Sequence, residues 1–142
     1  MKKYLILLLS LLLIACSSKA NIHIKKGTYV DNVNAEMYDP CYSVEIEEVN
    51  DDSISFYICM VGKNASPIYD TETITAHIQD NQTEVFNWED SWENSGTGTI
   101  SWSSEDEIIL NMQVVNEGPA NRSTLACENL KLTYQSTVEM NQ

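Results

Sequence analysis

The stretch CYSVEIEEVNDDSISFYICMV, residues 41 to 61, decides the fold. Its first half, Cys41–Val49, places apolar and polar residues at alternate positions, and its second half, Ser53–Val61, repeats that alternation. A period of two is the pattern of a β-strand that buries one face. The polar residues between the halves, Asn50–Asp52, are typical of a turn. The stretch predicts an antiparallel hairpin. Its apolar face would consist of Tyr42, Val44, Ile46, Ile54, Phe56, Ile58 and Met60.

The same alternation recurs along the rest of the chain. It covers residues 28–31, 71–79, 83–88, 97–102, 107–115 and 123–134. Short connections between such runs favour an antiparallel meander. We expect an all-β fold in which about eight antiparallel strands form a small barrel, with a β-sandwich as the alternative. In strand count and alternation this pattern resembles the lipocalin-type barrels.

The beginning of the chain has the organisation of an export signal. Lys2 and Lys3 give it a cationic start, and Leu5–Ile14 is a run of apolar residues with little interruption. A helix of that length rises about 15 Å, half the thickness of a bilayer core, so it suits a signal peptide better than a permanent span. We therefore expect residues 1–15 to be an N-terminal signal helix that is removed.

The end of this signal resembles the lipobox of bacterial lipoproteins. Leu13, Ile14 and Ala15 place branched residues and then a small one directly before Cys16. The resemblance implies that the Cys16 sulfur carries a diacylglycerol and that the chain is cut before it. An ordinary secretory signal with an incidental cysteine is the alternative. Lipid chains contribute about 0.8 kcal/mol per buried methylene group, so two or three of them anchor a protein firmly.

These boundaries divide the chain into three parts. Residues 16–26 are expected to be a lipidated tether, because they show no regular apolar periodicity. Residues 27–142 are expected to form a single barrel-like domain. The expected location is the cell membrane or an outer membrane, with the chain lipid-anchored on the extracytoplasmic side.

The charge balance is strongly acidic. The chain has 21 acidic and 8 basic residues and a formal net charge of −13. Loss of the signal would remove Lys2 and Lys3 and no acid, which makes the remainder more acidic still. Such a surface repels nucleic acid and anionic lipid headgroups. We expect no nucleic-acid partner, and the membrane contact to be made by lipid. The acidity serves either solubility or the recruitment of a cationic envelope protein.

Three cysteines remain after Cys16. An exported chain can form a disulfide, and the hairpin brings Cys41 and Cys59 opposite each other or one step diagonal. We therefore expect a Cys41–Cys59 disulfide, with a bridge from Cys127 to one of them as the alternative. No CxxC or HxxxH spacing occurs, so no metal site is expected.

No catalytic site is expected, and no cofactor. A serine or cysteine nucleophile needs a base, and the chain offers only His23 and His77. His77 falls on the polar face of its strand. Paired acids such as Glu105–Asp106 lie mostly at turns or strand ends, and neighbours on a strand point to opposite faces.

The stretch WEDSWENSGTG, residues 88 to 98, is the one candidate binding site. Aromatic rings beside polar groups suit an apolar or sugar-like ligand. The candidate residues are Trp88, Asp90, Trp92, Asn94 and Trp102. In the structural interpretation, Asp90 binds turn amides, Gly96 adopts a positive φ, and Trp92 folds over the barrel mouth as a plug.

Two functions follow from these patterns. The first is a non-catalytic protein-interaction module with an acidic surface, anchored to a membrane by lipid. The second is a small-ligand-binding barrel with a rim site near Trp92. Large residues on the inward face, such as Phe56, Trp88 and Trp102, indicate that a small barrel is filled by its own side chains, which favours the first.

Overall fold

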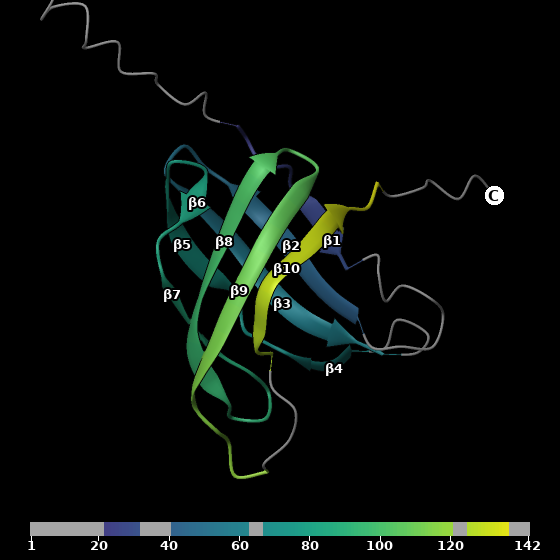
Figure 1. Cartoon of the computed structure of the whole chain (residues 1–142), viewed down its shortest axis with the longest axis vertical. Helices are drawn as coiled ribbons and strands as arrows, with labels where there is room; N and C mark the ends of the chain where they lie inside the picture. Colours follow the sequence, from purple (N-terminus) through teal and green to yellow (C-terminus); the bar gives the residue numbers. More distant parts are fainter. Residues whose placement is uncertain (1–21, 32–40, 63–66, 121–124, 137–142) are drawn as a thin grey trace, which may run out of the picture.

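The computed structural model describes residues 22–31, 41–62, 67–120 and 125–136, and in them the chain forms ten β-strands (Figure 1). The strands are β1 (Gly27–Val30), β2 (Cys41–Val49), β3 (Ser53–Val61), β4 (Pro67–Asp70), β5 (Ile74–Gln79), β6 (Gln82–Thr83), β7 (Phe86–Glu89), β8 (Ser95–Ser104), β9 (Glu107–Asn116) and β10 (Cys127–Tyr134).

Eight of the strands close into an antiparallel barrel. The ring runs β2-β1-β10-β9-β8-β6-β5-β3 and returns to β2, with β4 added at the edge of β3 and β7 at the edge of β8. Strand β1 closes it, because Tyr29 pairs with Val44 of β2 on one side and with Tyr134 of β10 on the other. The predicted meander barrel is confirmed, and the sandwich alternative is wrong.

The hairpin that decides the fold forms as expected. Val44 lies opposite Ile58 and Ile46 lies opposite Phe56, so the two apolar faces meet on one side. The register shifts between Ile46 and Glu48, so that Val49 pairs with Ile54. This irregularity allows the apolar residues of β2 to stay inside on both sides of it.

Two strands depart from the predicted runs, and both departures have a local cause. The predicted run 83–88 is divided into β6 and β7 by a break at residues 84–85. The strand β4, which was not predicted, is separated from β5 by a break at residues 71–73. At each break a buried threonine hydroxyl continues the ladder. Thr71 Oγ1 accepts the Ile58 N–H at 3.1 Å, and Thr83 Oγ1 accepts the Ile100 N–H at 3.0 Å. Side-chain pairing thus replaces main-chain pairing where the backbone turns away.

The interior of the barrel is occupied by side chains from around the ring. Tyr29, Phe56, Ile58, Ile100 and Leu110 have no exposed surface. Aromatic rings meet edge to face inside, with 5.1 Å between the ring centres of Phe56 and Phe86. The barrel is therefore filled by its own side chains, as expected for this number of strands.

One end of the barrel is closed by residues expected in the tether. Trp102 Nε1 donates to the Ile22 carbonyl at 2.7 Å, and the Ile22 N–H donates to Asn81 Oδ1 at 2.9 Å. Ile24 is buried and belongs to the core cluster. Residues 22–26 therefore pack against the barrel formed by the strands from Gly27 onward. Two isoleucines make this packing favourable, although they form no long periodic run.

Two glycines of β8 make room for aromatic rings. Gly96 pairs with Trp88 and Gly98 pairs with Phe86. A Cβ atom on Gly98 would lie 2.7 Å from two atoms of the Phe86 ring, and one on Gly96 would lie 1.8 Å from the Gln113 carbonyl oxygen. The expectation of a positive φ at Gly96 is wrong, because Glu93 takes the positive φ of the turn. Close approach, not backbone freedom, requires these glycines.

Gly98→Ala is expected to lower the free energy of unfolding by about 1–3 kcal/mol, because the added methyl overpacks the Phe86 ring. Urea denaturation followed by tryptophan fluorescence measures this. Ser103→Ala, at an exposed position of the same strand, is the control and should stay within about 0.5 kcal/mol of wild type. Equal stability of the two variants would contradict the assigned role of Gly98.

Candidate functional site

The two indoles of the predicted ligand site that lie on strands point into the barrel. Trp88 is 3% exposed and Trp102 is 6% exposed. Each indole N–H has a main-chain acceptor, the Thr97 carbonyl for Trp88 at 3.1 Å and the Ile22 carbonyl for Trp102 at 2.7 Å. Both rings are therefore part of the core and offer no stacking face to a ligand.

Asp90 and Asn94 hold the turn between β7 and β8. Asp90 Oδ1 accepts the N–H groups of Trp92 and Asn94, both at 2.9 Å. The Asn94 side-chain amide donates to Asp90 Oδ2 at 2.9 Å, and its carbonyl oxygen accepts the Gly118 N–H at 2.9 Å. Asp90 and Asn94 are buried, so their polar atoms serve the turn. These contacts agree with the structural interpretation of residues 88–98, in which Asp90 binds turn amides.

Trp92 is the one predicted ligand residue whose side chain is only partly buried, and it packs against the core. Its carbonyl oxygen lies 2.1 Å from where a Cβ atom on Gly118 would stand, so the loop after β9 presses directly on this turn. The five predicted residues are therefore divided: Trp88 and Asp90 line the hollow described next, whereas Trp92, Asn94 and Trp102 do not.

A surface hollow lies where the barrel wall opens between β5 and β7, and it includes part of the predicted stretch 88–98 in its lining. At one end the Glu84 N–H donates to the His77 carbonyl at 2.8 Å. At the other end the Ser91 N–H donates to the Asp70 carbonyl at 2.9 Å, beside a single bridge between Thr71 and Asp90. Between these contacts the two edges separate, because both strands are broken next to this line.

We call this opening the seam groove. It has a volume of about 1180 Å³. One wall is residues 70–75 and the other is residues 85–91, with the adjoining ends of β8 and β9 completing it through Ser95–Thr97, Val115 and Asn116. Figure 1 shows β5 and β7 on the same side of the barrel.

The chemistry of the seam groove is acidic with exposed apolar residues. Among the residues that the structure describes, its lining contains the acids Asp70, Glu72, Glu89 and Asp90 and no lysine, arginine or histidine. Val85 and Val115 are 69% and 66% exposed, among the most exposed large apolar side chains of the described residues. Two of the five predicted ligand residues, Trp88 and Asp90, belong to its lining, whereas sequence reasoning missed the opposite wall, residues 70–75, which only the barrel brings beside them.

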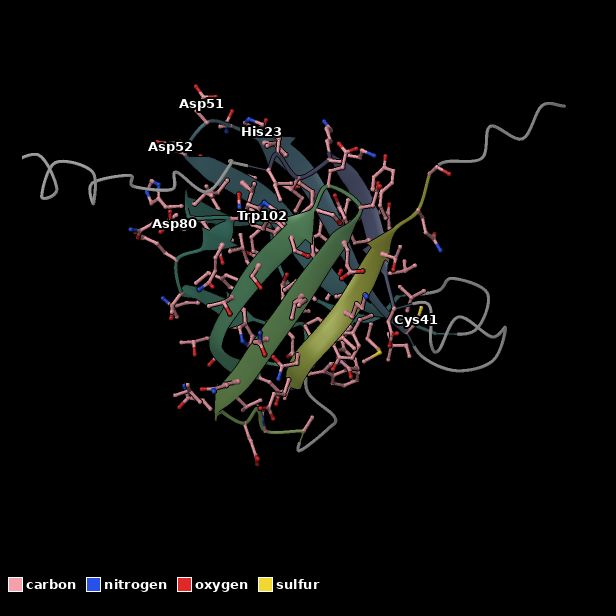
Figure 2. The ribbon with its side chains drawn as sticks, turned by 45° about the horizontal axis from the view of Figure 1, so that its top comes forward. His23, Cys41, Asp51, Asp52, Asp80 and Trp102 are labelled. Carbon is pink, nitrogen blue, oxygen red and sulfur yellow. The ribbon has the colours of Figure 1, made fainter. Side chains whose placement is uncertain are left out.

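Acidic side chains also surround one end of the barrel. Figure 2 shows Asp51, Asp52 and Asp80 at the tips of hairpins on the same side as His23 and Trp102, with Cys41 well away from them. The Lys25 ammonium group lies 2.7 Å from Asp106 Oδ1 and 3.3 Å from Glu105 Oε1 at this end. The hydrogen bond to Asp106 raises the pKa of Lys25, which stays a cation.

The cysteines of the described residues are all unbridged, so the expected Cys41–Cys59 disulfide is not formed. The register explains this, because Cys41 lies opposite Val61 and Cys59 lies opposite Ser43. Diagonal positions stand farther apart than the about 4 Å between Cβ atoms that a disulfide needs. The alternative bridge from Cys127 is absent as well. Burial raises the pKa of Cys127 to about 12 and also raises the pKa of Cys41 and Cys59, which keeps these thiols protonated and poorly nucleophilic.

The remaining chemical groups offer no further site among residues that the structure describes. His23 and His77 are both exposed. No group of three or more His, Cys, Asp or Glu side chains in that part of the chain is arranged to bind a metal ion. Within the same residues, no helix has the length and apolar character that crossing a bilayer requires. Cys16 and the signal lie outside them.

Comparison with known proteins gives no match: no protein family, no curated protein and no solved structure is similar to this chain. The described geometry and the sequence itself are therefore the basis for its function.

Asp90→Ala is expected to lower the free energy of unfolding by about 1–3 kcal/mol, because it leaves the buried Asn94 amide without its acceptor. Thermal and urea denaturation followed by circular dichroism measure this. Glu89→Ala changes the exposed neighbour and should shift stability by no more than about 0.5 kcal/mol. If both variants unfold together, the Asp90–Asn94 contacts do not hold the turn.

Proposed function

We propose that this protein is a non-catalytic interaction module that is lipid-anchored outside the cytoplasm and binds a cationic protein through its acidic outer surface. The observation that carries the proposal is the filled interior of the barrel. Phe56, Ile58 and Leu110 are fully buried and leave the inside to the protein's own side chains. Recognition then falls to the outer surface, as it does in proteins that use a barrel as a rigid support.

The charge of that surface supports a cationic partner. The chain has 21 acidic residues against 8 basic ones. Two of the lysines are already engaged, Lys25 with Glu105 and Asp106, and Lys131 with Glu107 at 2.7 Å. The remaining carboxylates raise the local concentration of positively charged proteins and steer their approach.

Lipid attachment at Cys16 would fix the orientation of the barrel. Ile22 is bonded to Asn81 and Trp102 at the end that carries Asp80. Ile22 is six positions after Cys16, and an extended chain of that length spans at most about 20 Å. In a lipidated protein this end would lie close to the bilayer, and the Trp92 turn would lie at the end that faces away.

The alternative, a small ligand held near Trp92, has weaker support. Trp88 and Trp102 are buried in the core, while Asp90 and Asn94 bond to each other. The histidines give no support for an enzymatic function. Both are exposed, whereas a nucleophile needs a base that is held in a fixed orientation. We therefore retain the interaction module as the proposed function.

The partner is tested by capture from an envelope extract. Full-length protein should retain proteins of positive net charge at about 0.05 M salt and release them at about 0.3 M, because salt screens exposed charge pairs. A variant with Gln in place of exposed Glu48, Glu72, Glu89 and Glu128 should retain fewer of them. Capture that changes neither with salt nor with the Glu-to-Gln substitutions would exclude the acidic-surface proposal.

The anchor is tested by Cys16→Ser. Because the thioether needs a sulfur atom, this variant should move from the membrane fraction to the soluble fraction, while Cys41→Ser, which keeps Cys16, should stay with the membrane. Mass spectrometry of the native protein should find acyl groups on residue 16 and residues 1–15 absent. A native protein with an unmodified Cys16 would exclude lipid attachment.

A further inference from the structure

We propose that the seam groove binds an extended, lysine- or arginine-rich segment of the partner as an added strand along β7. This inference rests on the proposed function and deepens it, since it assigns the cationic partner to one place on the barrel. It also states the form in which the partner is recognised: an extended main chain with basic and apolar residues at alternate positions.

The first argument is the free edge of β7. This strand pairs with β8 on one side, where Asn87 lies opposite Thr97 and Glu89 opposite Ser95. The Asp90 N–H is directed toward Asn94, and the Ser91 N–H is directed across the seam toward Asp70. Because main-chain groups alternate along a strand, those of Asn87 and Glu89 face the seam.

The opposite wall follows the same rule. The His77 carbonyl accepts across the seam, and the Ile78 N–H is directed away from it, toward Asp52. Alternation then directs the main-chain groups of Thr75 toward the seam as well. Open main-chain edges of this kind are the sites at which proteins add a peptide as an extra strand.

The second argument is charge. Asp70, Glu72 and Glu89 line the seam groove, and no basic residue of the described ranges joins them in its lining. Glu72 and Glu89 are exposed and stand on opposite walls. A bound segment would therefore have carboxylates on both sides of its main chain, which favours ammonium or guanidinium groups on its outward-facing residues.

The third argument is the alternation of β7 itself. Phe86 and Trp88 point inward and are buried, whereas Val85, Asn87 and Glu89 are exposed. An added strand continues this alternation, so that every second residue points toward the barrel and the others lie beside Glu72 and Glu89. The favoured segment therefore alternates apolar and basic residues. A second copy of this chain, with its own net charge of −13, is disfavoured by like-charge repulsion.

The probe is a fluorescently labelled peptide of alternating valine and lysine, long enough to follow Val85–Glu89, which spans about 17 Å at roughly 3.3 Å per residue. Its binding to the full-length protein in a neutral detergent is measured by anisotropy at about 0.15 M salt. A second peptide has the same side chains but N-methyl groups on the residues that would bond to β7. We expect it to bind at least about tenfold more weakly, since N-methylation removes strand pairing and keeps the charge.

Two charge-reversed variants locate the site. Glu72→Lys with Glu89→Lys should weaken binding of the first peptide at least about tenfold. Glu48→Lys with Glu128→Lys makes the same change in net charge at exposed positions outside the seam groove and should weaken it no more than about threefold. Circular dichroism verifies that both remain folded.

The edge of β7 is tested by Asn87→Pro. Proline removes the N–H that faces the seam. It is tolerated at this edge position because the Asn87 N–H is directed away from β8. This variant should bind the first peptide about fivefold more weakly and should leave the weak binding of the N-methylated peptide unchanged.

The outcomes separate this inference from the proposed function. Equal binding of both peptides, or equal effects of the two charge-reversed variants, overturns the strand-addition site while capture of cationic proteins by the acidic surface still stands. A dimer of the wild-type protein that Asn87→Pro converts to monomers assigns the edge to a second copy and overturns the inference. Peptide binding with the expected pattern, but without salt-sensitive capture of cationic proteins, supports the groove and rejects the wider proposal.

Discussion

A closed ring of eight antiparallel strands has an interior only wide enough for side chains, and this limit governs the rest of the structure. Every second residue of each strand must contribute to one shared core. Large rings need space inside the barrel, and Gly98 leaves space for the Phe86 ring because it has no side chain. Closure itself depends on β1, which joins the hairpin of β2 and β3 to the last strand. A barrel so filled keeps its inside for stability and leaves recognition to its outside.

The regularity of the ring is interrupted at one line, and this is where the molecule offers a specific surface. The breaks before β5 and after β6 lie at the two ends of this line, one at the bridge between Thr71 and Asp90 and the other at the contact between Glu84 and His77. At the breaks, Thr71 continues the hydrogen-bond ladder to β3 and Thr83 continues the ladder to β8. The core therefore stays closed while the facing edges of β5 and β7 separate. The result is an opening in the wall that is acidic, partly apolar and lined by strand edges. Continuous strands would have removed those edges from reach.

The acidic residues have different roles at different places. Asp90 is buried and organises a turn, while Glu105 and Asp106 hold Lys25 at the opposite end. Glu72 and Glu89 stand exposed in the seam groove. Net charge alone does not distinguish these roles, because a carboxylate's effect depends on its burial and on the donors around it. In the candidate ligand site of the sequence, the polar groups of Asp90 and Asn94 are bonded to each other.

The sequence by itself determined the all-β class, the meander and most of the core. Alternation in Cys41–Val61 is enough for this, because a strand with one apolar face has few ways to bury it. Only the tertiary structure decided which features meet. Residues 22–26 join the body through Ile24, the register separates Cys41 from Cys59, and two distant breaks form the seam groove. Local pattern specifies the side on which a residue lies, whereas pairing register and ring closure specify its neighbours, and these depend on the whole chain at once.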